Sequence, residues 1–131
     1  MKYMVNGSFI NRPLMRITLI ATLIFLSVFW ITTLVMYLTR MGFTPEGVVA
    51  YYRGSEATFT PPRTFGSMLE VTHGHLPVMA MVALLLTHLF IFSEHSGKVK
   101  IFAIVAFFAS ALLGEASGWL VRFVHPLFAW L

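Results

Sequence analysis

The sequence predicts an all-α integral membrane protein with three transmembrane helices and one short interfacial helix. Of its 131 residues, 58% are hydrophobic and 11% are charged, and the mean hydropathy is +0.82. A soluble domain carries about 25% charged residues. A chain this short cannot bury so much apolar surface in a core of its own, so we expect the lipid bilayer to cover it.

Charge and cysteine content narrow the classes of function. The net charge of +4 does not indicate nucleic-acid binding, because most basic residues stand at the ends of apolar runs, where they set topology and meet lipid headgroups. There is no cysteine, which excludes disulfides, thiolate-bound iron–sulfur or zinc centres and covalently attached haem. A cofactor held non-covalently by histidine remains open.

The first predicted span covers about residues 14–39. Residues 17–38 contain no charge, and these 22 positions reach roughly 33 Å at about 1.5 Å per residue, enough to cross a bilayer. Asn11 and Pro13 are start signals for this helix. The run is too long for a signal peptide and lacks a small-residue cleavage site, so we expect an uncleaved span.

A short interfacial helix is predicted within residues 44–54, "TPEGVVAYYRG". Thr44 is a suitable N-cap, Pro45 suits the first helical position, and Gly54 is a suitable terminator. The two tyrosines and the arginine near its end suit a helix lying at the level of the lipid headgroups.

The second predicted span covers about residues 68–93. Ser67 and Glu70 have the spacing of a capping box, which predicts that the helix begins there. Pro77 lies inside the run, where its missing N–H and its ring favour a bend.

The third predicted span covers about residues 99–124 and ends at His125, because the residue before a proline avoids helical angles. The following residues 126–131 could begin a fourth helix, but they are too few to cross a membrane. We therefore interpret residues 1–131 as a single transmembrane domain.

The distribution of basic residues favours an N-terminus on the inner side of a bacterial cytoplasmic membrane. This orientation places five of the nine basic residues inside, in agreement with the positive-inside rule. The inner set is Lys2, Arg12, Arg16, Lys98 and Lys100. The start of the second span, Glu115 and His125 would then lie toward the outer face.

Histidines are concentrated in the second span. Ionisable residues within a membrane are costly, which favours a functional site. We expect His95, at the end of the apolar run, to meet headgroups, and we select His73, His75, His88 and His125 as cofactor-binding candidates. Haem b needs imidazole ligands and an apolar wall, so His75, His88 and His125 are the candidate ligands of a haem iron.

His75 and His88 stand thirteen positions apart on one membrane helix, which resembles cytochrome b, where two such histidines serve two stacked haems. The three spans without cysteine also resemble the haem-binding anchor subunits of succinate dehydrogenase and fumarate reductase. These resemblances imply haem b, quinone chemistry and partners such as a cytochrome c or an iron–sulfur subunit. The interval is one residue shorter than in cytochrome b, which turns one ligand by about 100°.

One chain cannot complete a site for two haems, because the first span contains no histidine. One haem could be ligated by His73 or His75 together with His125. His88 would then need a ligand partner from another subunit, a symmetry mate or a methionine.

The third span carries a second cluster, "ALLGEASGWLVRFVHP". Gly114 and Gly118 have a GxxxG spacing, which favours close approach of a helix but could also make room for a flat ring. Glu115 lies about two turns inside the span, and a carboxylate near histidines can accept protons during quinol oxidation. The alternative for Glu115 is a structural ion pair with Arg122, and Trp119 is interpreted as an interface anchor.

These observations predict a membrane subunit of a respiratory or other electron-transfer complex. It would bind haem b, quinone or both and pass electrons to partner subunits, and it is too small to be a complete enzyme. Glu115 is the candidate for proton transfer. The alternative is a cofactor-free structural or accessory subunit of a larger membrane complex, whose histidines and Glu115 pair with neighbouring subunits. A proton or metal-ion transporter ranks below both, because the first span offers only serine and threonine to line a polar path.

Overall fold

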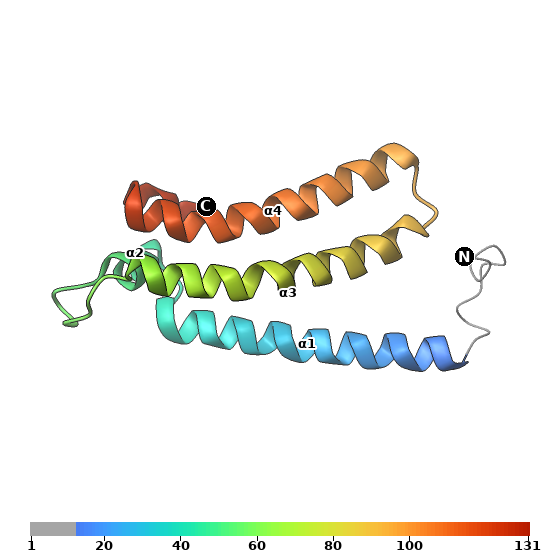
Figure 1. Ribbon diagram of the computed structural model, residues 1–131, viewed down its shortest axis with the longest axis horizontal. Coiled ribbons are helices and arrows are strands. Elements are labelled where there is room, and N and C mark those ends of the chain that lie inside the picture. Colours follow the sequence, from blue (N-terminus) through green and yellow to red (C-terminus); the bar gives the residue numbers. More distant parts are fainter. Residues whose placement is uncertain (1–12) are drawn as a thin grey trace. The chain divides into compact units, whose positions relative to one another are not determined.

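The computed structural model describes residues 13–131, and within them its elements are helices joined by loops and turns, with one isolated bridge between Ser55 and Thr60 (Figure 1). The sequence signal at Asn11 and the basic residues Lys2 and Arg12 lie outside this range. The elements in chain order are α1 (Pro13–Met41), α2 (Pro45–Arg53), α3 (Phe65–Ile91), α4 (Gly97–Phe123) and the 3₁₀ helix η2 (Pro126–Trp130).

Three of these helices, α1, α3 and α4, are long and apolar enough to cross a membrane. The predicted all-α fold with three candidate spans is therefore confirmed. The helices divide between two units. One contains α1 and ends at Gly42, and the other runs from Phe43 to Leu131.

Helix α1 satisfies most of its small hydroxyl side chains within its own backbone. Five of them donate to a backbone carbonyl about one turn earlier, which lowers the cost of placing them in an apolar environment. The residues concerned are Thr18, Thr22, Ser27, Thr32 and Thr39.

Helix α2 begins and ends at the residues that the sequence predicted. The Thr44 side chain accepts from the Gly47 N–H, Pro45 occupies the first turn, and Gly54 follows the last residue with φ of +84°. A β-carbon at Gly54 would lie 2.7 Å from the carbonyl oxygen of Thr60. The turn therefore needs glycine for both its angle and its space.

Helix α3 begins three residues earlier than the capping-box prediction placed it, so that prediction is wrong. Thr64 is the N-cap, and its hydroxyl accepts from the Ser67 N–H at 3.1 Å. Ser67 thus lies in the first turn, and its own hydroxyl donates to the Thr64 carbonyl at 3.0 Å. The helix continues through Pro77 without interruption.

Helices α3 and α4 pack against each other, and α2 and η2 pack against α4 and against one another. The core of this unit is small. It consists mainly of compact side chains that allow close packing: Met68, Ala83, Thr87, Gly118 and Val121. Most large apolar side chains of α3 and α4 are exposed, which fits helices surrounded by lipid.

The chain turns sharply after α4. His125 caps η2, its Nδ1 accepting from the Leu127 N–H at 3.2 Å, and Pro126 occupies the first turn. The segment that could have begun a fourth helix is thus a short 3₁₀ helix that packs back on α2 and α4.

Candidate functional site

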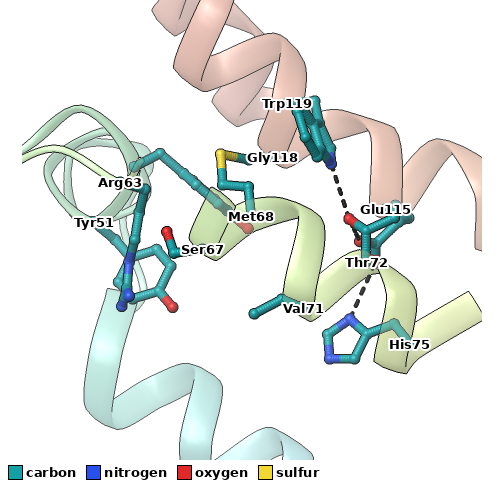
Figure 2. Close-up of a pocket in the computed structure, with 12 residues that line it drawn as sticks. Tyr51, Arg63, Ser67, Met68, Val71, Thr72, His75, Glu115, Gly118 and Trp119 are labelled. Carbon is teal, nitrogen blue, oxygen red and sulfur yellow. Dashed lines mark hydrogen bonds and ion pairs between the residues drawn. The ribbon is translucent and has the colours of Figure 1, made fainter. Parts of the chain in front are cut away.

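Four polar side chains form a continuous hydrogen-bonded chain between α3 and α4 (Figure 2). The indole N–H of Trp119 donates to the hydroxyl oxygen of Thr72 at 2.9 Å. The Thr72 hydroxyl donates to Oε1 of Glu115. The other carboxylate oxygen, Oε2, lies 3.1 Å from Nδ1 of His75. We call this arrangement the Trp–Thr–Glu–His chain.

Helical spacing brings these four residues together. Thr72 and His75 are three positions apart on α3, so they share a face, and Glu115 and Trp119 are four positions apart on α4. The indole of Trp119 packs against the rings of Phe65 and Phe123, with centroids 5.2 and 5.6 Å away. These contacts hold its N–H toward Thr72.

The acid and the histidine differ in exposure. The side chain of Glu115 is 16% exposed and that of His75 is 53% exposed. A carboxylate within a membrane span is costly when unpaired, and here each of its oxygens has a partner. Glu115 is thus held inside the helix pair, while the imidazole lies at its edge.

A pocket adjoins this chain and is lined by α2, α3, α4 and Arg63. The volume of the pocket is about 70 Å³. One water needs about 10–15 Å³, and pockets that enclose drug-sized ligands have about 300–1,000 Å³. The enclosed part of the pocket therefore has room for a few waters or for the edge of a ring.

Arg63 connects the elements around the pocket. Its guanidinium carbon lies 4.2 Å from the ring centroid of Tyr51, and its backbone N–H donates to the Tyr52 carbonyl at 3.0 Å. Its own carbonyl accepts from Nε of Arg122 at 2.7 Å. The suggested ion pair between Arg122 and Glu115 is therefore not formed, since Arg122 bonds to Arg63 and Glu115 bonds to His75 and Thr72.

The GxxxG spacing of α4 accommodates a tyrosine ring. A β-carbon at Gly118 would lie 2.6 Å from the hydroxyl oxygen of Tyr52 and 2.7 Å from its Cζ. A β-carbon at Gly114 would meet nothing within 4 Å, and this glycine lines the pocket. The small residues thus admit α2 at one position and leave open space at the other.

Residues 42–131 match a family model, Aq_1264_TM, described as a transmembrane helical domain. The chain belongs to this family. No curated protein and no solved structure matches it. The family match covers α2, α3, α4, η2 and the whole Trp–Thr–Glu–His chain, and with the three apolar helices it identifies an integral membrane protein in contact with the lipid bilayer.

Of the histidines that the sequence predicted to bind a cofactor, His75 lies beside Glu115. His73 is exposed on α3 and is not among the residues lining the pocket. His125 lines a separate pocket between α2 and η2, so it does not share a site with His75. His88 lies in the last turn of α3, nearer its end than the predicted span placed it, and its exposed ring is edge-on to Phe92 at 5.3 Å.

No group of three or more His, Asp or Glu side chains within residues 13–131 is arranged to hold a metal ion. His95 is exposed beyond the end of α3, and its ring lies 5.4 Å from that of Phe90.

Sequence reasoning missed Thr72, Trp119 and Tyr52 as members of the site. Trp119 was interpreted as an interface anchor, and Tyr52 only as a headgroup contact. Helical spacing was a signal for two of them. Thr72 stands three positions before His75, and Trp119 stands four positions after Glu115. The contact of Tyr52 with Gly118 depends on how α2 folds back, which has no comparable signal.

Proposed function

We propose that this chain is a membrane subunit of an electron-transfer complex, and that its pocket binds the headgroup of a quinol. The observation that carries the proposal is the pair formed by Glu115 and His75 at a pocket within the apolar helices. The proposal includes an inner bacterial membrane with the N-terminus inside, and partner subunits that carry the electron acceptor.

The lining of the pocket supports a quinol as ligand. A quinol has a flat apolar ring with hydroxyl groups, so it needs hydrogen-bond acceptors at its edge and apolar contacts on its faces. Glu115 and His75 supply the polar edge, and Met68 and Val71 supply apolar surface. The small volume suits the edge of the ring, while the rest of the quinol and its tail lie in lipid.

The residues act on protons rather than on electrons. Oxidation of a quinol to a quinone releases two electrons and two protons. One-electron centres of partner subunits, such as haem or iron–sulfur groups, would take up the two electrons one at a time. In this proposal the two protons leave one after the other through Glu115 and His75. Such proton transfer by a positioned side chain contributes about 10²–10⁴-fold to a rate.

We also propose haem b as a cofactor shared with a partner, with His88 as its ligand from this chain. His88 is exposed on α3 and lies beside the ring of Phe92. Since His75 and His125 line different pockets, the second ligand would come from a partner chain. The purified complex should show a b-type reduced-minus-oxidised spectrum that His88→Leu removes and His95→Leu leaves intact, and an unchanged spectrum in His88→Leu would exclude this ligand.

Glu115→Gln tests the proton-transfer role. The variant keeps the shape of the side chain and should lower quinol-linked turnover of the complex by about 10²–10³-fold while the complex still assembles. Glu70→Gln is the matched control, since Glu70 is an exposed glutamate on α3, and it should turn over normally. Full turnover in Glu115→Gln would refute the role of Glu115, and failed assembly would favour the cofactor-free structural subunit.

Binding can be tested without turnover. In a Trp30→Phe, Trp130→Phe background, Trp119 is the remaining tryptophan, and a short-chain benzoquinone should quench its fluorescence saturably in nanodiscs. A matched reporter that retains only Trp30 should show weak, unsaturated quenching. Equal quenching of both reporters would mean that quinone merely partitions into the lipid.

A further inference from the structure

We infer that Trp119 and Thr72 fix the direction of the hydrogen bonds at Glu115, so that the mobile proton of the site lies between Glu115 and His75 and leaves through His75. This inference rests on the proposed function only for the source of the proton. The hydrogen-bond direction follows from the chemistry of the four side chains.

The direction begins at Trp119, whose indole N–H is a donor only. It donates to the Thr72 oxygen, which leaves the hydroxyl hydrogen of Thr72 to be given elsewhere. Other hydroxyls of these two helices donate to carbonyls of their own helix, such as Thr87 to Ala83 and Ser117 to Gly114. Thr72 instead donates across the interface to Oε1 of Glu115, so this oxygen acts as an acceptor.

The second carboxylate oxygen has no such fixed direction. Nδ1 of His75, 3.1 Å from Oε2, donates when it carries a hydrogen and accepts when it does not. A proton can thus sit on the nitrogen or on Oε2 of Glu115 without breaking the bond. Because Thr72 already donates to Oε1, protonation of the carboxylate is confined to the side that faces His75.

The difference in exposure between Glu115 and His75 indicates where the proton leaves the site. Glu115 is largely covered, whereas about half of the His75 side chain is exposed. The remaining ionisable groups that line the pocket are Tyr51, Tyr52 and Arg63, and an arginine side chain offers no acceptor. Among the described residues, His75 is therefore the imidazole that can take a proton from Glu115 and carry it to the edge of the helix pair.

Infrared difference spectroscopy of the unliganded protein in nanodiscs tests the hydrogen-bond direction. The carboxyl and carboxylate bands of Glu115 are identified by their loss in Glu115→Gln. Thr72→Val removes a donor to the ionised form and should raise the ratio of protonated to ionised Glu115 about tenfold at fixed pH. Thr72→Ser, which keeps the hydroxyl, should restore the wild-type ratio.

Trp119→Phe provides a second route to the same test should Thr72→Val fold poorly. It leaves the Thr72 hydroxyl free to turn away, so it should move the ratio in the same direction, by about two- to threefold. A wild-type ratio in Thr72→Val, or in Trp119→Phe where Thr72→Val does not fold, overturns the inferred direction.

The exit is tested by proton release from the complex, followed with a pH-sensitive dye. His75→Ala should slow release about tenfold or more, and added imidazole should restore it, because a soluble base can replace the missing ring. Wild-type release, or slow release without rescue, overturns the role of His75. Should Glu115→Gln keep full quinol turnover while Thr72→Val still shifts the infrared ratio, the proposed function fails and the hydrogen-bond direction stands.

Discussion

The two ends of the α3–α4 pair join the helices by different means. At the end near α2, which we call the polar end, side-chain hydrogen bonds cross from one helix to the other through Thr72, Glu115 and their partners. At the opposite end, which we call the apolar end, Thr87 is buried. Its hydroxyl donates to the carbonyl of Ala83 in its own helix at 2.6 Å. No cross-helix side-chain hydrogen bond forms there among the described residues.

This difference distinguishes a hydroxyl that bonds within its own helix from one that bonds to a neighbouring helix. Both threonines lie on α3, yet one satisfies its hydroxyl within that helix and the other directs it to a carboxylate of α4. The histidines repeat the contrast, since His75 bonds to Glu115 whereas His88 contacts an aromatic ring. The acceptor to which a threonine hydroxyl donates therefore distinguishes the two ends better than the residue type does.

Among the comparisons between the two ends, the largest effect should come from removing the imidazole of His75. His75→Leu should lower quinol-linked turnover about 100-fold, because Glu115 loses the group that accepts its proton. His95→Leu removes an exposed histidine from the opposite end and should leave turnover within about twofold of wild type. Equal losses in the two variants would remove the functional distinction between the ends.

Arg122→Leu should destabilise the polar end by about 1.5–3 kcal/mol, because the carbonyl of Arg63 loses a charged donor. Arg53→Leu, at an exposed position in the last turn of α2, is the control and should have little effect. The measurement is the midpoint of denaturation in SDS, followed by circular dichroism. Equal stability of the two variants would mean that Arg122 does not hold the Arg63 segment on α4.

Gly118→Ala should destabilise the protein by about 1–2 kcal/mol, because the added methyl group displaces Tyr52. Gly114→Ala adds the same group in open space and should be neutral or gain up to about 1 kcal/mol from helix propensity. The same SDS titration compares them. A destabilised Gly114→Ala would show that the GxxxG pair contacts something other than Tyr52.

The smallest effect is expected at the apolar end. Thr87→Val replaces a hydroxyl by a methyl group of similar size, and the Ala83 carbonyl keeps its place in the helix, so stability should change by less than about 0.5 kcal/mol. Thr72→Val should cost more, since it leaves Oε1 of Glu115 without its donor. A large loss in Thr87→Val would show that this hydroxyl has a partner outside the chain.

Periodicity and helix-end chemistry predicted the helices well, because the three apolar runs and the ends of α2 depend on local sequence. The start of α3 was misplaced because Ser67 and Thr64 both offer capping side chains three residues apart, and the Thr64 hydroxyl is the one that caps. The sequence placed Glu115 near the histidines at the start of α3, and in the structure it lies beside His75. The choice between His73 and His75 needed the rotation of one helix against the other, which no local pattern contains.

The loop between α2 and α3 is held by backbone contacts at its base, and its tip is exposed. Gly54 is enclosed by the backbone of Thr60 and Pro62, and Ser55 and Thr60 exchange two backbone hydrogen bonds, whereas residues 56–59 are exposed. An epitope or protease site inserted between Ala57 and Thr58 should therefore leave the stem undisturbed. The accessibility of this insert in intact cells would reveal on which side of the bilayer the loop lies.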